Sequence, residues 1–355
     1  MKKLLSPFHK NGLELKNHLV MAPMTRSRAI DNIPNDLMAE YYGQRAGAGL
    51  IVTEGTSPTP DGLGYPRIPG IFSKAQIDGW KKITKAVHEG GSKVFIQLMH
   101  TGRIGHQDNL PDGAELLGPS SIPAAGKIYT DANGMQEHSA PIELTTARVK
   151  EVIQGFVKAT ENAIEAGFDG VEFHGANGYL IEQFLNPHVN TRTDEYGGSI
   201  AKRAALTLEI VSKSAALVGK EKIGIRFSPY SLAGDLQAYD PQEVHETYAY
   251  LATELNKIGI AYIHINLNEK TAPKTLEVIR NNFKGTIIQC SGFTPESGEN
   301  ALKGNLTDLI AYGRPFIANP DFVNRIDKNA PLNAPDFSTA FSPGAKGYTD
   351  YPSLN

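Results

Sequence analysis

The chain has 355 residues, a length that fits either two ordinary domains or one large α/β barrel. Its 35 Lys and Arg nearly balance its 38 Asp and Glu, so the net charge is only −3 and no basic surface of the kind that binds nucleic acid is expected. Hydrophobic residues make up 40% of the chain, which is enough to fill a core. No stretch approaches the roughly 18 apolar residues of a membrane-spanning helix.

The cysteine count and the N-terminal residues bear on the cellular compartment. Cys290 is the only cysteine, so an intramolecular disulfide is excluded. The first lysines are followed by LLSPFHKNG, which lacks the apolar segment of a secretion signal. We therefore expect a cytoplasmic protein, either an enzyme or a ligand-binding protein, with no membrane and no nucleic acid as a partner.

Strand-like and helix-like segments alternate along most of the chain. Residues 1–17 are predicted to form an extended leader, with Asn11 and Gly12 as the turn of a hairpin. The strands that follow are predicted at 18–23, 50–54, 93–98, 169–173, 222–227, 261–266, 286–290 and 307–311. Amphipathic helices are predicted at 35–46, 74–90, 146–167, 199–218, 241–258, 273–283 and 295–303. Because short buried strands followed by helices must be parallel, eight such units favour a TIM barrel over a doubly wound sheet.

Three segments fall outside this repeat, namely residues 101–144, 183–198 and 321–355. Long loops at the carboxyl ends of barrel strands usually build and cover the active site. No linker-like tract or charge run divides the chain. We therefore expect a single α/β domain over residues 1–355, a (β/α)8 barrel with a leader hairpin, a capping loop at 101–144 after the third strand and a C-terminal tail at 321–355.

The residues that follow the predicted strands are rich in hydrogen-bond donors and poor in carboxylates. The best carboxylate candidates are Glu54 and Glu172, whereas a glycosidase needs two carboxylates about 5–10 Å apart. His100, His174 and His264 stand close to strand ends, but no HExxH or similar ligand spacing occurs. Metal catalysis is therefore not expected.

The loops after the seventh and eighth strands form the usual phosphate site of a TIM barrel. Here they contain Gly292, Gly313 and Arg314. Glycine lets backbone N–H groups approach a phosphate, and arginine clamps it with two donors, although each residue alone also fits a strand end or a surface salt bridge. Gly47 and Gly49 precede a strand instead of following one, so they are not a dinucleotide fingerprint.

The sequence resembles the old yellow enzyme family through a set of motifs that occur in order between residues 20 and 352. They are PMTRSRA, TEGT, QLMHTGR, HGANGYLIEQFLNPHVNTRTDEYGGS, RFSP, GRPFIANPDF and YTDYP. The long motif is highly specific, whereas RFSP or TEGT alone is weak. The resemblance implies an FMN-containing barrel that takes a hydride from NAD(P)H and reduces the activated C=C bond of α,β-unsaturated carbonyl or nitro compounds.

The resemblance also implies which residues hold the flavin. Thr25 would bind the flavin O4, Gln97 the pyrimidine edge, and Arg226 would lie near N1 and O2, where a permanent cation favours hydride uptake. The remaining positions expected around FMN are Pro23, Gly55 close to the ring, and Gly292, Gly313 and Arg314 at the phosphate. From the residues alone, Thr25 also fits a packing role and Arg226 an ion pair inside the barrel.

Three residues of the long motif resemble the catalytic group of the family. His174 and Asn177 would bind the substrate oxygen, and Tyr179 would protonate the α-carbon. Read without the family, His174 also fits a core histidine and Tyr179 an aromatic side chain that packs on Phe184.

The substrate pocket is expected to differ from that of many family members. Met99 stands where they have Trp after Gln-Leu, which should loosen the wall and change how substrates orient. Tyr65 and Tyr351 are expected to face the same pocket.

Two other functions stay open at this point. A related flavin barrel acts on nitrate esters or N-methyl substrates, and a flavin-binding module would bind without turnover. Since no dinucleotide fingerprint occurs, NADH and NADPH are equally compatible as reductants, and so are a monomer and a homodimer.

Overall fold

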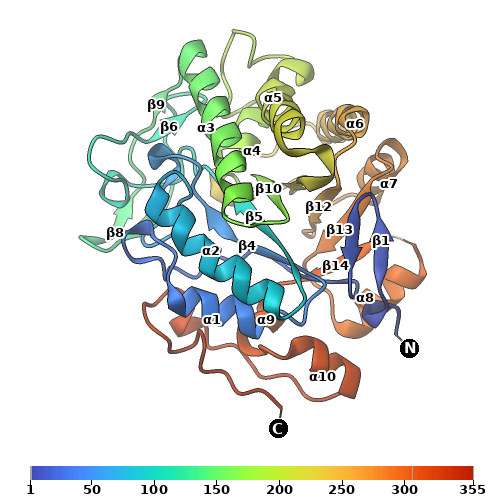
Figure 1. Ribbon diagram of the computed structural model, residues 1–355. Coiled ribbons are helices and arrows are strands. Elements are labelled where there is room, and N and C mark those ends of the chain that lie inside the picture. The colour runs from blue at the N-terminus through green and yellow to red at the C-terminus, as the bar shows by residue number, and fades with distance from the viewer. Residues whose placement is uncertain (1, 306, 355) are drawn as a thin grey trace.

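The computed structural model describes residues 2–305 and 307–354, and its centre is a closed barrel of eight parallel strands (Figure 1). The strands follow one another around the barrel in chain order, and each overlaps one of the predicted segments. They are β3 (Leu19–Met21), β4 (Leu50–Thr56), β5 (Lys93–Leu98), β10 (Gly170–Gly175), β11 (Ile223–Phe227), β12 (Tyr262–Asn266), β13 (Thr286–Cys290) and β14 (Leu309–Tyr312). The predicted (β/α)8 TIM barrel is confirmed.

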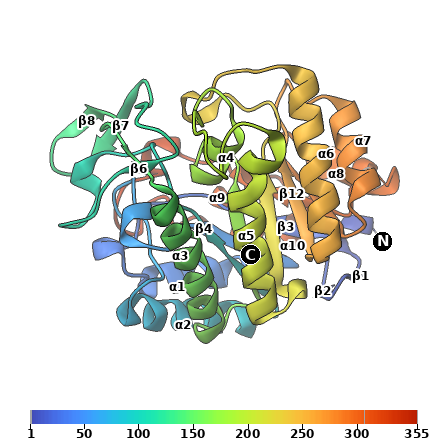
Figure 2. The same cartoon turned by 90° about the horizontal axis from the view of Figure 1, so that it is seen from above.

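Helices surround the strands, as Figure 2 shows from above. Those that were predicted are α1 (Asp36–Gln44), α2 (Lys74–Glu89), α3 (Thr146–Glu165), α5 (Ile200–Val218), α6 (Pro241–Ile258), α7 (Pro273–Asn282) and α8 (Pro295–Lys303). Their ends follow local chemistry: Ser73 and Gln76 form a capping box before α2, and Gly259 ends α6 in the left-handed region. In the described part of the chain, no helix combines the length and the apolar character that crossing a membrane requires.

Three short helices were not predicted, because fewer than three turns give too little periodicity to detect. They are α4 (Leu180–Leu185), α9 (Arg314–Ala318) and α10 (Phe322–Lys328). The first of these directly follows Tyr179, which the resemblance predicts to be catalytic.

The leader forms the predicted hairpin, in which β1 (Phe8–Lys10) pairs with β2 (Leu13–Leu15). Asn11 and Gly12 both have positive φ, 50° and 79°, as a two-residue hairpin turn requires. The hairpin's apolar side chains share one cluster with alternate residues of the barrel strands, among them Val20, Leu50, Val52, Phe95, Tyr262 and Ile288. The leader therefore closes the amino-terminal end of the barrel with apolar packing.

The long loop after β5 carries its own small strands. An antiparallel hairpin joins β7 (Lys127–Thr130) to β8 (Gly134–Glu137), and a short parallel pair joins β6 (Leu117–Gly118) to β9 (Ile142–Glu143). In Figure 2 this loop lies at the upper left of the view, on the opposite side of the molecule from β1 and β2 at the lower right.

Buried arginines hold the C-terminal tail, which runs beside α1 (Figure 1). Arg28 donates to the carbonyl oxygens of Thr339 (2.8 Å) and Ala340 (2.6 Å), and Arg26 donates to that of Gly347 (2.7 Å). Because both arginines lie in the segment between β3 and α1, the tail is tied to the same segment that carries Thr25.

Candidate functional site

The barrel interior changes from apolar to polar along its axis. Alternate residues of a strand share a face, so Gln97 points inward like Phe95, and His264 like Tyr262. The strand register pairs His174 with Arg226 and Arg226 with His264, which places these three side chains next to one another on neighbouring strands. A polar layer thus lies above the apolar cluster, toward the carboxyl ends of the strands.

Glu172 is the centre of this layer. Its Oε1 accepts a hydrogen bond from Gln97 Nε2 (2.8 Å), and its Oε2 lies 2.9 Å from His264 Nδ1. Burial raises the pKa of Glu172, but the charge and hydrogen bond of His264 and the charge of Arg226 outweigh burial and hold it below its ordinary value. Glu172 is therefore ionised, and it fixes the amide of Gln97.

Arg226 has an unusual set of partners for a buried cation. One terminal nitrogen donates to Asn266 Oδ1 (3.2 Å) and lies 3.8 Å from Cys290 Sγ. Its Nε is buried and has no partner among the described residues. A buried guanidinium donor of this kind fits a ligand with acceptor atoms over the end of β11.

His174 and Tyr179 meet at the end of β10. Their rings lie edge to face, with centroids 4.8 Å apart and planes at 80°. Burial and the nearby charges of Arg226 and His264 hold the pKa of His174 well below its ordinary value, so its ring is neutral. Ala176 N–H donates to His174 Nδ1 (3.3 Å), which places the ring proton on Nε2 as a donor.

Tyr179 is a protonated phenol at neutral pH, because burial raises its pKa well above its ordinary value. Its hydroxyl donates to the hydroxyl of Tyr65 (3.2 Å). Both tyrosines pack on an apolar cluster that contains Leu63, Ile68 and Met99. The structure thus brings Met99, Tyr65 and Tyr179 together, and that they line a substrate pocket stays a prediction.

Asn177 adopts the left-handed conformation, with a φ of 58°. Its Oδ1 accepts from Asn266 Nδ2 (2.9 Å), so its own Nδ2 is turned away from Asn266 as a donor. Its backbone N–H donates to Ser228 Oγ (2.8 Å). Asn266, Ser228 and the buried Glu182 behind them were given no role from the sequence; an acidic residue inside the apolar run LIEQFL was the available signal.

Five of the residues expected to hold FMN follow three adjacent strands of the barrel. Pro23 and Thr25 follow β3, Gly313 and Arg314 follow β14, and Gly292 follows β13, three neighbours in the barrel. Gly292 has a φ of 77° and open space where a Cβ would be, and Arg314 is exposed, 5.8 Å from the ring of Phe337.

Two expected site residues have contacts that their predicted roles did not anticipate. A Cβ at Gly55 would lie 2.5 Å from Met99 Sδ, so this glycine makes room for Met99. Tyr351 accepts a hydrogen bond from Asp336 N–H (2.8 Å) within the tail, and in the described part of the chain it is outside the cluster of Met99 and Tyr65. Their roles at the flavin and in the substrate pocket stay predictions.

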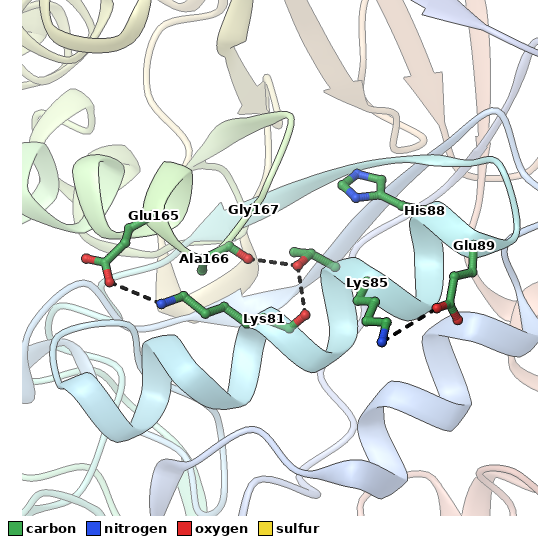
Figure 3. A pocket seen from close by; sticks show the side chains of 8 residues that line it. Lys81, Lys85, His88, Glu89, Glu165, Ala166 and Gly167 are labelled. Atoms are coloured by element: carbon green, nitrogen blue, oxygen red, sulfur yellow. Dashed lines mark hydrogen bonds and ion pairs between the residues drawn. The ribbon is translucent and has the colours of Figure 1, made fainter.

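A separate hollow of about 550 Å³ lies between α2 and the end of α3 (Figure 3). Its charged side chains are paired with each other, Lys81 with Glu165 (3.2 Å) and Lys85 with Glu89 (3.9 Å). It is a solvated surface between helices, away from the polar layer of the barrel. Among the described residues, no three His, Cys, Asp or Glu side chains lie close enough together to hold a metal ion.

Comparison with known proteins agrees with the geometry. Residues 3–333 match the family model described as NADH:flavin oxidoreductase / NADH oxidase family. The chain is 40% identical to 12-oxophytodienoate reductase 1 of Oryza sativa subsp. japonica, over 99% of this chain and 93% of that protein. It is 38% identical to flavin oxidoreductase hxnT of Emericella nidulans, over 99% of this chain and 98% of that protein.

Solved structures show the same relationship. Morphinone reductase in complex with tetrahydroNAD superposes with a TM-score of 0.95 at 40% identity, over 99% of this chain and 98% of that chain. The old yellow enzyme homologue from Zymomonas mobilis has a TM-score of 0.94 at 36% identity, over 99% of both chains. The protein is an NAD(P)H-dependent oxidoreductase with FMN as its cofactor, and it belongs to the NADH:flavin oxidoreductase / NADH oxidase family, which includes the old yellow enzyme homologues.

Proposed function

We propose that the enzyme reduces the activated C=C bond of α,β-unsaturated carbonyl or nitro compounds. The observation that carries this proposal is the group at the end of β10. A neutral His174 and the Asn177 amide, which Asn266 orients, present hydrogen-bond donors. The protonated phenol of Tyr179 lies beside them, with its ring centroid 4.8 Å from that of His174. Two donors and one acid are what the reduction of such a bond needs.

The residues fit a bound flavin. Arg226, whose buried Nε has no partner in the described part of the chain, and Gln97, anchored by Glu172, offer donors for the polar edge of the ring. Thr25, Pro23 and Gly55 would lie around the ring. Gly292, Gly313 and Arg314 would hold the phosphate. A bound FMN would supply the hydride chemistry, from NAD(P)H to the β-carbon of the substrate.

The oxygen of the substrate would accept from His174 Nε2 and from Asn177 Nδ2. These donors stabilise the negative charge that develops on the oxygen as the β-carbon takes the hydride, by up to about 3 kcal/mol per donor. Because His174 is buried and neutral, it acts as a hydrogen-bond donor and does not transfer its proton.

Tyr179 would supply the proton to the α-carbon. Its raised pKa keeps the phenol protonated across the ordinary pH range, and a nascent carbanion is basic enough to take the proton. The Tyr65 hydroxyl, 3.2 Å away, is the neighbour through which the proton would be restored.

Anaerobic half-reactions test this function. The purified protein with FMN should be yellow, should bleach when NADPH or NADH is added, and should regain its colour when an enone or a nitroalkene is then added. Deuterium from the reductant should appear on the β-carbon of the product. If the reduced enzyme is reoxidised only by nitrate esters, the C=C assignment is wrong, and if it never bleaches, the chain binds flavin without turnover.

We also infer that the enzyme works in the cytoplasm as a monomer or a homodimer. A lone buried cysteine, Cys290, is typical of a reducing compartment. Light scattering after size exclusion would determine the oligomeric state.

A further inference from the structure

Glu182 is a buried carboxyl on α4 that the reaction above does not use. It follows Tyr179 by three residues, and only 5% of its surface is exposed. Three donors surround its two oxygens: Gly178 N–H lies 2.7 Å from Oε2, Ser228 Oγ lies 2.8 Å from Oε1, and Tyr248 OH lies 3.4 Å from Oε1. These partners come from three separate segments of the chain.

Two of these hydrogen bonds lead directly to the substrate-binding residues. Ser228 Oγ also accepts from the backbone N–H of Asn177 (2.8 Å), so Ser228 links Asn177 to Glu182. Asn177 and Gly178 have positive φ, 58° and 82°, and a Cβ at Gly178 would lie 2.2 Å from Ala233 O. The tight left-handed turn that carries Asn177 on one side and Tyr179 on the other is therefore held at two successive N–H groups.

We propose that Glu182 is a positioning residue for C=C reduction: through Gly178 N–H and Ser228 Oγ it holds the turn that aims Asn177 and Tyr179, and it does so best when its carboxyl is ionised. The proposal rests on the function proposed above. It concerns the step that uses the substrate oxygen and the proton, since Asn177 and Tyr179 are not among the residues expected to hold FMN.

The hydrogen-bond inventory explains the preference for the ionised form. A carboxylate only accepts, so it satisfies Gly178 N–H, Ser228 O–H and Tyr248 O–H together. A protonated carboxyl adds one more donor, which has to displace one of the two hydroxyl protons. The Ser228 O–H and the Tyr248 O–H can both turn, and Ser228 is the one whose oxygen also accepts from Asn177 N–H. When the Ser228 hydroxyl turns, it no longer donates to Glu182, and the hydrogen-bonded link from Glu182 through Ser228 to Asn177 weakens.

Glu182 can change its protonation state near neutral pH, because its pKa is raised and a cavity next to it gives protons a route to solvent. Burial, opposed only in part by its hydrogen bonds, raises the pKa of Glu182 to about 8. A cavity of about 310 Å³ lies against it, between α4, the loop that contains residues 230–239, α6 and the start of α7. The other titratable side chains that line this cavity are Tyr230, Tyr239, Tyr248, Lys270 and Lys274. The Arg203–Glu243 ion pair lies behind Tyr239, and the same loop and α6 also carry Asp235, Asp240 and His245.

The test measures the rate of each half-reaction in the FMN-loaded enzyme as a function of pH, with stopped-flow absorbance. In the wild type, the rate of enone reduction should rise as pH increases through about 8, because Glu182 loses its proton there. Glu182→Gln should remove this rise and lower kcat for the enone roughly 10- to 100-fold, with less change in KM. Bleaching by NAD(P)H in the same variant should keep the wild-type pH profile.

Two further variants make the outcome decisive. Glu165→Gln removes an exposed carboxyl from α3 and should leave both half-reactions unchanged. Ser228→Ala removes the hydroxyl that joins Asn177 to Glu182 and leaves the Gly178 hydrogen bond to Glu182 in place. It should slow enone reduction while the unfolding temperature and flavin content stay near those of the wild type, and it decides the matter if Glu182→Gln does not fold. A pH rise that persists in Glu182→Gln, or a wild-type rate in Ser228→Ala, overturns the proposal. A wild type that bleaches but never reduces enones overturns the proposed function instead.

Discussion

His264 and Glu172 form a completely buried pair across the barrel. His264 Nδ1 lies 2.9 Å from Glu172 Oε2, and neither side chain has any exposed surface. Their strands are two apart in the barrel, with β11 between them. Because Gln97 Nε2 donates to the other oxygen of Glu172, the pair also fixes a residue expected at the flavin. The carboxylate that pairs with His264 therefore also orients the amide that is expected to bind the flavin.

Removing this carboxylate should cost stability in a defined pH range. The pKa of Glu172 is held below its ordinary 4.5, so its contribution is complete above pH 4.5 and disappears as pH falls through the lowered pKa. The pKa of His264 is raised above its ordinary 6.5, so its contribution is complete below pH 6.5 and disappears as pH rises through the raised pKa. Glu172→Gln should therefore be destabilised most between pH 4.5 and 6.5, by about 3 kcal/mol.

The measurement is the unfolding temperature of wild type and Glu172→Gln from pH 4 to 9 with saturating FMN. The difference between them should shrink on both sides of that range. Glu165→Gln, which breaks an exposed ion pair with Lys81, should stay within about 0.5 kcal/mol of the wild type throughout. A difference that does not vary with pH would show that the charges of the pair do not matter.

Tyr179→Phe should separate the two half-reactions. Without its hydroxyl the substrate lacks an acid at the α-carbon, so enone reduction should slow about 100- to 10,000-fold. Reduction of the flavin by NAD(P)H, which needs no proton from this group, should stay within a few-fold of the wild type. Stopped-flow absorbance measures both rates, and Tyr129→Phe, at a tyrosine 49% exposed in the capping loop, serves as the control. Undiminished enone reduction would remove Tyr179 from the mechanism.

The barrel could be predicted from the sequence because each of its strands is a short apolar run followed by an amphipathic helix. The ends of the strands were less accurate: β4 continues to Thr56 and β10 to Gly175, beyond the predicted 54 and 173. At these ends polar residues are buried, and hydrophobic periodicity does not detect them. Glu54 illustrates this, since it lies inside a fully buried strand and contacts Tyr42 OH through Oε1.

The site could be predicted only one residue at a time. Sequence reasoning placed Glu172, Arg226 and His264 at strand ends, but the pairing of Glu172 with His264 joins residues 92 positions apart and depends on the register of three strands. The same holds for Asn177, whose orientation is set by Asn266 on β12 and by Ser228 after β11. Long-range hydrogen bonds of this kind have no local sequence signal.

Met99→Ala should widen the substrate pocket. Met99 is 1% exposed, and its sulfur occupies the space where Gly55 lacks a side chain. Truncation should cost about 2–5 kcal/mol of unfolding free energy and leave a cavity beside Tyr65 and Tyr179. The ratio of kcat/KM for a β-substituted enone to that for an unsubstituted one should therefore rise. Met135→Ala, at a methionine 56% exposed, is the matched control, and an unchanged ratio would place Met99 outside the substrate wall.

Arg28→Lys should release the C-terminal tail. The guanidinium of Arg28 donates from two nitrogens to the carbonyl oxygens of Ala340 (2.6 Å) and Thr339 (2.8 Å), a geometry that an ammonium group cannot reproduce. Loss of one such hydrogen bond from a buried charge should cost about 2–3 kcal/mol. Because the lost hydrogen bond holds the tail, the tail should detach from the barrel more often. A protease specific for apolar residues should therefore cleave faster beside the exposed Phe337 and Phe341.

The same substitution should also weaken FMN binding, since Thr25, Arg26 and Arg28 belong to one segment and the tail packs against it. Tail cleavage followed by mass spectrometry, and the Kd for FMN from fluorescence quenching, measure the two effects separately. Arg148→Lys, at a half-exposed ion pair with Glu115 (2.8 Å), should change neither. If the tail of Arg28→Lys is cleaved no faster than that of the wild type, the arginine does not hold the tail; if cleavage is faster but the Kd for FMN is unchanged, the tail and the flavin site are independent.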